Sequence, residues 1–137
     1  MKALKLAITK QMTNDTEYLA LMGVPTVFPY RTFFQKPPEV PTFPEVVFNF
    51  ASTNYDTSND RTSTSAQIIL DINVWSEDGT YEDIIDRIKV LFHQKAIGTT
   101  GAHAILLREP QDMKDEEFNV YGKVVSFAVF YRRGIYE

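Results

Sequence analysis

The chain has 137 residues, of which 44% are hydrophobic and 13% aromatic, enough to build one buried core. Its net charge of -4 disfavours a DNA or RNA reader, because binding to phosphates relies on positive charge. The absence of cysteine excludes disulfides and thiolate chemistry, and no apolar run is long enough to predict a signal peptide or a membrane-spanning helix.

Two helical segments are predicted at the N-terminus. Between residues 3 and 12, apolar side chains recur at the spacing of one helix face, namely Leu4, Ala7, Ile8 and Met12. The following run, Thr13 to Thr16, is rich in residues that cap helix N-termini, and a short second helix ending at Gly23 is expected after it.

A proline-rich segment and a strand follow. Five prolines lie between Pro29 and Pro44, and each removes a backbone donor, so this segment is expected to be extended or at a sheet edge. A stiff crossing within the domain is favoured over a proline-rich partner motif. Residues 45–52 then carry a β-branched and aromatic run typical of a well-buried strand.

The segment from residue 53 to 65 is almost entirely small or polar and predicts a long, mobile hairpin loop. Oxygen-bearing side chains alternate within it as in a calcium loop: Asn54, Asp56, Ser58 and Asp60. Asn59 stands where such a loop needs glycine, and Ser65 where it needs a bidentate glutamate. A solvated loop is therefore favoured over a metal site.

The next strand alternates clearly. One face carries four aliphatic side chains, Ile68, Leu70, Ile72 and Val74. The other face is polar in its middle, at Asp71 and Asn73, and apolar at its ends, at Ile69 and Trp75. This pattern predicts a sheet with helices on one face and solvent or another subunit on the other.

The clearest helix in the sequence follows this strand. Apolar residues fall at a 3.6-residue period from Tyr81 to Phe92, and Thr80 with Asp83 predicts a capping box at the start. Gly98 and Gly101 are expected to end the helical region.

A final hairpin is predicted from residues 103–108 and 118–133, joined by a loop over residues 109–117. The fold class expected from these elements is α+β, a mostly antiparallel β-sheet packed against an N-terminal helix and one central amphipathic helix. Residues 1–137 are expected to form a single domain, because no linker separates two cores.

No catalytic centre, cofactor-binding site or metal site is predicted. His93 and His103 have no second ligand at helical spacing, so solvated or hydrogen-bonded structural roles are favoured. The serines gather in the polar loop and none stands in a nucleophile elbow. Neighbouring carboxylates lie in loops or at helix ends, where solvation is the ordinary state. We therefore expect a protein that is not an enzyme.

Aromatic residues in segments predicted as loops or edges exceed what one small core needs: Phe28, Tyr30, Phe33, Phe34, Phe43, Tyr55 and Tyr136. Such residues are enriched in protein interfaces, but burial in the chain's own core explains them equally well. The sequence leaves these two interpretations open.

The order of elements resembles that of the tail terminator, or head-tail joining, proteins of long-tailed phages. The resemblance rests on the N-terminal helix, the Val24-Pro25 turn, the run from Phe43 to Phe48, the polar loop, the strand ending in Trp75-Ser76 and the helix from Tyr81 to Phe92. It covers nearly the whole chain, through patterns of hydrophobicity around a few fixed residues.

The resemblance implies a structural virion protein without a cofactor. Such a protein would form a ring of six copies that caps the tail tube, stops its polymerisation and joins the tail to the DNA-filled head. Its partners would be itself, the tail tube protein and the head-tail connector protein, with DNA passing through the channel without specific binding and with no membrane contact. It would reside at the head-proximal end of the virion tail, and in the host cytoplasm during assembly.

Interface residues are expected in the two polar loops and in the aromatic segment: Tyr55, Asp56, Asp60, Arg61, Asp112, Lys114, Glu116, Phe33 and Phe34. Two other functions stay open. One is a different head-tail connector component, such as a stopper or minor capsid protein. The other is a small-molecule-binding α+β domain that uses the space between helix and sheet.

Overall fold

The computed structural model describes residues 2–26, 28–39, 41–55 and 65–132. The sheet in this part of the chain has the strand order β1-β2-β3-β7-β5-β4, and β6 pairs with β7. Only the β1–β2 pair is parallel among the strand pairs described, so the predicted α+β class with a mostly antiparallel sheet is confirmed. The elements in chain order are α1 (Lys2–Thr13), α2 (Thr16–Leu21), β1 (Thr32–Phe34), β2 (Glu45–Tyr55), β3 (Ser65–Ser76), α3 (Thr80–Phe92), β4 (Lys95–Ala96), β5 (His103–Leu106), β6 (Gln111–Asp115) and β7 (Val120–Arg132).

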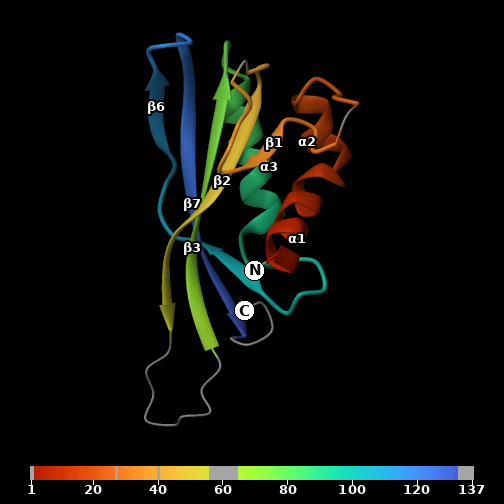
Figure 1. Ribbon diagram of the computed structural model, residues 1–137, viewed down its shortest axis with the longest axis vertical. Helices are drawn as coiled ribbons and strands as arrows, with labels where there is room; N and C mark the ends of the chain where they lie inside the picture. Colours follow the sequence, from red (N-terminus) through yellow and green to blue (C-terminus); the bar gives the residue numbers. More distant parts are fainter. Residues whose placement is uncertain (1, 27, 40, 56–64, 133–137) are drawn as a thin grey trace.

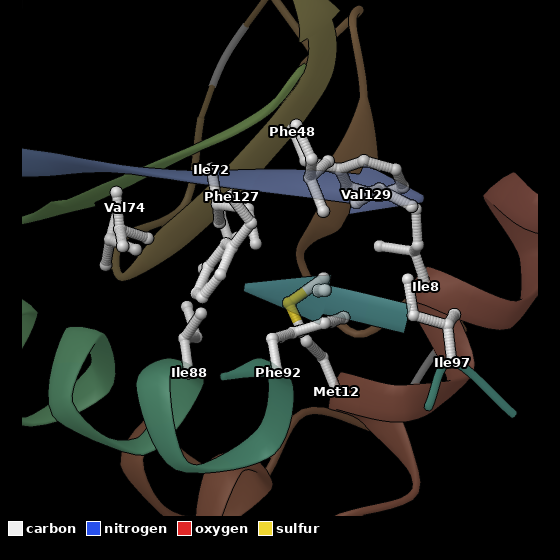
Figure 2. Packing of buried hydrophobic residues seen from close by; sticks show 14 of the residues in the cluster. Ile8, Met12, Phe48, Ile72, Val74, Ile88, Phe92, Ile97, Phe127 and Val129 are labelled. Carbon is white, nitrogen blue, oxygen red and sulfur yellow. The ribbon is translucent and has the colours of Figure 1, made fainter. Parts of the chain in front are cut away.

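The hydrophobic core lies between the sheet and the helices, which all lie on the same side of it (Figure 1). The predicted alternation of β3 is confirmed, because Ile68, Leu70, Ile72 and Val74 are all buried. Figure 2 shows Ile88 and Phe92 of α3 directed toward the sheet residues Ile72 and Phe127. The Phe92 and Phe127 rings lie 5.6 Å apart, so this pair joins the two layers at the centre of the core.

The start of α3 differs from the predicted capping box. Gly79 is the N-cap residue and provides no side-chain acceptor. Instead, the Asp78 carboxylate accepts hydrogen bonds from the Thr80 backbone N–H at 2.9 Å and from the Thr80 hydroxyl. Ser76 Oγ accepts a third hydrogen bond, from the Tyr81 N–H at 3.1 Å. The acceptors therefore come from residues before the helix, within reach of the N–H groups that its first turn leaves unpaired.

The end of α3 also differs from prediction. The helix ends at Phe92, with His93 in an extended conformation, and β4 follows at once. Gly98 and Gly101 instead occupy the turn between β4 and β5, with φ angles of 55° and 82° that favour glycine. They shape a hairpin rather than stop the helix.

Residues 111–115 form a strand, β6, where a loop over residues 109–117 was expected. The strand pairs with residues 120–124 of β7 through a tight turn at residues 116–119. Its sequence is polar because β6 is an edge strand with little burial, so hydrophobic alternation does not mark it. The expected pairing of residues 103–106 with the long final strand is confirmed.

The proline-rich segment crosses one end of the sheet, as expected. Pro37, Pro38 and Pro41 lie against side chains of β2 and β3 on the face opposite the helices. Before this crossing, β1 pairs in parallel with Val46 to Phe48 at the sheet edge. The crossing therefore covers the start of β2 but not the rest of that face.

Polar contacts tie α1 and α2 to α3. The Gln11 side chain of α1 donates to the Leu91 and Ala96 carbonyls and accepts from the Gly98 N–H at 2.8 to 2.9 Å. Asp15, the N-cap of α2, accepts from the Tyr18 N–H and from two nitrogens of Arg87 at 2.7 and 2.8 Å. This bidentate geometry fixes α2 against α3.

Replacing Asp15 by Asn should keep the helix cap but remove the ion pair with Arg87, at a cost of about 1 kcal/mol of unfolding free energy. Hydrogen bonding to Arg87 lowers the pKa of Asp15 from 3.8, so its contribution is present above that pH and is lost as the pH falls through the folded-state pKa. Urea unfolding at pH 7 and pH 3 measures the effect. Asp112→Asn, at a highly exposed carboxylate 3.8 Å from Lys123, is the control. An Asp15→Asn protein as stable as the parent at pH 7 would contradict this role.

Candidate functional site

The face of the sheet without helices is the first candidate assembly surface (Figure 1). Away from the proline-rich segment, the strand registers place apolar residues of intermediate or full exposure on it, and four of these define what we term the uncovered face: Ile69, Ile105, Val124 and Phe130. A half-exposed apolar layer of this kind is typical of surfaces that contact another protein.

The centre of the uncovered face is polar and contains a hydrogen-bonded group. Ser126 Oγ donates to Asp71 Oδ1 at 2.6 Å, and Arg108 donates to Ser126 Oγ at 3.4 Å. These contacts account for Asp71, one of the two polar residues that the sequence shows in the middle of β3. A partner protein could therefore contact apolar side chains of the uncovered face on both sides of this polar centre.

Of the strand edges that have no partner strand in the described part of the chain, the two longest belong to β2 and β6. β1 covers β2 only as far as Phe48, so the outer edge of residues 49–55 has no described partner strand. The outer edge of β6 likewise has no partner among the described residues. Unpaired strand edges present rows of backbone donors and acceptors to which another chain can add.

The predicted interface residues fall in three separate places. Tyr55 ends β2 opposite Ala66, and its predicted neighbours Asp56, Asp60 and Arg61 lie outside the described residues. Lys114, with Asp112 and Glu116, lies at the other end of the sheet, because its partner Tyr121 pairs with Ser76 of β3. The length of β3 from Ala66 to Ser76 is about 33 Å, so Tyr55 and the Lys114 group do not lie at one contact site in a single chain.

Charged side chains of the β6–β7 hairpin are exposed to solvent. Lys114 Nζ lies 3.7 Å from Glu116 and 5.3 Å from the centre of the Tyr121 ring. Two carboxylates of the hairpin are highly exposed, with 80% of the Asp112 side chain and 83% of the Glu116 side chain accessible. These side chains are accessible to a partner at little desolvation cost.

Phe33 and Phe34 lie on β1, at the edge of the sheet. The Phe34 ring packs 5.3 Å from Phe48 and 5.4 Å from Phe50, and the Lys5 ammonium lies 4.2 Å from its centre. Phe34 therefore closes the core beside α1. Phe33 points to the opposite side of the strand and is half-buried.

The two histidines have structural roles. His93 Nδ1 accepts a hydrogen bond from the Leu106 N–H at 2.9 Å, and His103 stacks on Phe130 with 5.5 Å between ring centres. Across the residues that the structure describes, no three acidic or histidine side chains gather in a way that would hold a metal ion. In the same residues, no helix combines the length and apolarity needed to cross a membrane.

Glu45 is a candidate functional residue that the sequence analysis did not single out. It is 4% exposed, and its Oε2 has no hydrogen-bond partner. Burial raises the pKa of this carboxyl from 4.5 to about 7. The only sequence signal is a glutamate directly after a proline-rich run and directly before buried strand residues.

Comparisons with known proteins show a likeness of fold. No family model matches the chain, and no curated protein matches it. Among solved structures, a chain from one described as "Virion of native gene transfer agent (GTA) particle" is similar, with a TM-score of 0.65 and 13% sequence identity. The match covers 91% of this chain and 91% of that chain, so nearly the whole fold is shared.

Proposed function

We propose that residues 1–137 act as one subunit of a ring that caps a phage tail tube at its head-proximal end, ends tube polymerisation and joins the tail to the DNA-filled head. The observation that carries this proposal is the likeness of fold to a chain of a gene transfer agent virion over 91% of both chains. A structural and non-enzymatic role in a virion accounts for that likeness. The order of sequence elements supports the finer assignment to the tail terminator.

Ring closure would use the uncovered face and the open strand edges. Contacts between different surfaces of neighbouring copies close into a ring when the rotation between copies divides a full turn. The apolar residues Ile105 and Phe130 lie on one surface suited to such a contact. The outer edge of residues 49–55, which has no partner strand among the described residues, is a second. A ring of six copies follows the pattern of the family that the sequence resembles.

The two ends of the sheet would contact two different partners. Asp112, Lys114 and Glu116 lie at one end, and Tyr55, the last residue of β2, lies at the other. In a ring with these ends on opposite sides, one end would meet the tail tube protein and the other the head-tail connector protein. The net charge of -4 would keep DNA phosphates from adhering to the channel.

Substitution of Ile105 by Lys tests the use of the uncovered face. Ile105 is 40% exposed, so the change should leave the fold intact but place a charge in the proposed contact. Light scattering after size-exclusion chromatography should give six times the 15.7-kDa chain mass for the parent and a smaller species for the variant.

The matched control is Val90→Lys, which adds the same charge at an exposed position on α3. It should keep the parent's mass, and circular dichroism should be unchanged in both variants. A parent protein that stays monomeric at every concentration, also with tail tube protein present, would overturn the ring. Equal behaviour of the two variants would overturn the use of this face.

A further inference from the structure

One cavity on the side of the sheet opposite the helices contains a buried carboxylate oxygen that has no hydrogen-bond partner. It has a volume of about 310 Å³ and is bounded by the proline-rich segment, the start of β2, the end of β3 and the β6–β7 hairpin. Glu45 lines it, almost fully buried, with an Oε2 that accepts no hydrogen bond. A buried carboxylate in this condition is costly, so the cavity is suited to a group that supplies donors.

The walls of the cavity are aromatic. Trp75 lies directly opposite Glu45 in the register of β2 and β3. The rings of Phe43 and Phe118 lie 6.2 Å apart in an edge-on arrangement, and all three aromatic residues line the cavity. Aromatic faces attract cations, and a planar guanidinium also stacks on them.

The charge of the cavity is negative. Asp115 is the second acidic residue that lines it, and its Oδ1 already accepts the N–H groups of Glu117 and Phe118 at 2.9 and 3.3 Å. The other described residues around the cavity are three prolines, Val47 and Asn73, so no described lysine or arginine lines it. Two carboxyl groups and three aromatic rings thus face a space that contains no positive charge from the described part of the chain.

We propose that this cavity binds an arginine side chain of a partner protein, with Glu45 accepting the guanidinium N–H groups and Trp75 and Phe118 packing on its plane. Arginine fits better than lysine, because its flat, forked group matches both a carboxylate and aromatic walls. The carboxylate would gain the hydrogen bonds that it lacks. This inference goes beyond the proposed function and does not depend on ring formation.

A fluorescence titration tests the proposal directly, because Trp75 is the single tryptophan of the chain and lies in the cavity wall. The probe is N-acetylarginine methylamide, added at pH 8 to the full chain. The matched probe is N-acetylcitrulline methylamide, which has nearly the same shape but no charge. The arginine probe should give a saturable change, with binding roughly tenfold or more tighter than that of the citrulline probe.

Glu45→Gln should lose this preference for arginine, since it retains the shape of the side chain but not its charge. Glu109→Gln, which makes the same change at an exposed carboxylate that does not line the cavity, should keep it. Circular dichroism confirms that both variants are folded. Equal binding of the two probes by the parent, no saturable change with the arginine probe, or an unaltered preference in Glu45→Gln would each overturn the proposal. An equal response to N-acetyllysine methylamide would overturn the assignment of arginine.

The pH dependence provides a second readout. Burial raises the pKa of Glu45 to about 7, and a bound guanidinium favours the ionised form. Affinity for the arginine probe should therefore rise as the pH increases through about 7, then level off. The described charged groups that face the cavity are Glu45 from β2 and Asp115 from β6. Affinity that is flat from pH 6 to pH 8 in the parent would contradict the role of Glu45.

Discussion

Gly122→Ala should destabilise the fold by about 3 kcal/mol or more, because β7 leaves no room for a side chain at this position. A Cβ at Gly122 would lie 2.1 Å from the Val74 carbonyl oxygen and 2.9 Å from the Trp75 ring. The first of these neighbours is backbone within the β3–β7 pair, so relief requires the two central strands to separate.

Urea unfolding at equilibrium measures this loss as a lower midpoint with an unchanged slope. Gly79→Ala is the matched control, since a Cβ there meets nothing within 4 Å, and its cost should stay within about 1 kcal/mol. A Gly122→Ala protein with the parent's midpoint would contradict this prediction. It would mean that β3 and β7 do not approach each other closely at Gly122.

Phe127→Ala should cost about 3 to 5 kcal/mol, the usual range for deleting a fully buried aromatic ring. Phe127 has no exposed surface and contacts Phe92 of α3 across the core (Figure 2). Its loss leaves a cavity where the sheet and α3 meet, and the surrounding side chains only partly fill it.

The control for this substitution is Phe28→Ala. That ring is 53% exposed and touches Tyr30 edge-on at 5.7 Å, so its removal should cost about 1 kcal/mol or less. Thermal and urea unfolding compare the two variants. Similar losses in both would contradict the placement of Phe127 at the centre of the core.

The sequence predicts those elements whose hydrophobic period is complete. In β3, alternate residues from Ile68 to Val74 all face the helices, and in α3 the 3.6-residue period matches the buried stripe. The sequence of β3 also predicts which face of the sheet has no helices, because Asp71 and Asn73 are polar and lie on that face. These elements are recognisable because burial on one face selects apolar side chains at a fixed spacing.

Elements that are stabilised by pairing with adjacent strands, rather than by burial, do not show such sequence patterns. β6 is polar and exists because β7 provides its hydrogen bonds, and β1 is three residues long beside a proline-rich segment. The acceptor role of Asp78 at the start of α3 depends on the path of the chain before the helix. Such features need the tertiary structure, which local propensity does not contain.

The predicted interface residues show the same limit. The sequence places Lys114 and Glu116 in an exposed, charged segment, and the structure places this segment at one end of the sheet. The sequence does not indicate that this end lies about 33 Å from Tyr55. The sequence also does not predict that Glu45 is buried. Its burial results from the tertiary structure, because the proline-rich segment and Phe118 meet over the start of β2.

Negative-stain electron microscopy of the purified protein mixed with its tail tube protein tests the central proposal most directly. The account predicts closed rings with an open channel, alone and seated at one end of each tube, and tubes that stop growing once capped. Ile105→Lys should abolish the rings and leave tube ends uncapped, whereas Val90→Lys should not. Tubes that keep growing with bare ends in the presence of the folded parent protein would contradict the account.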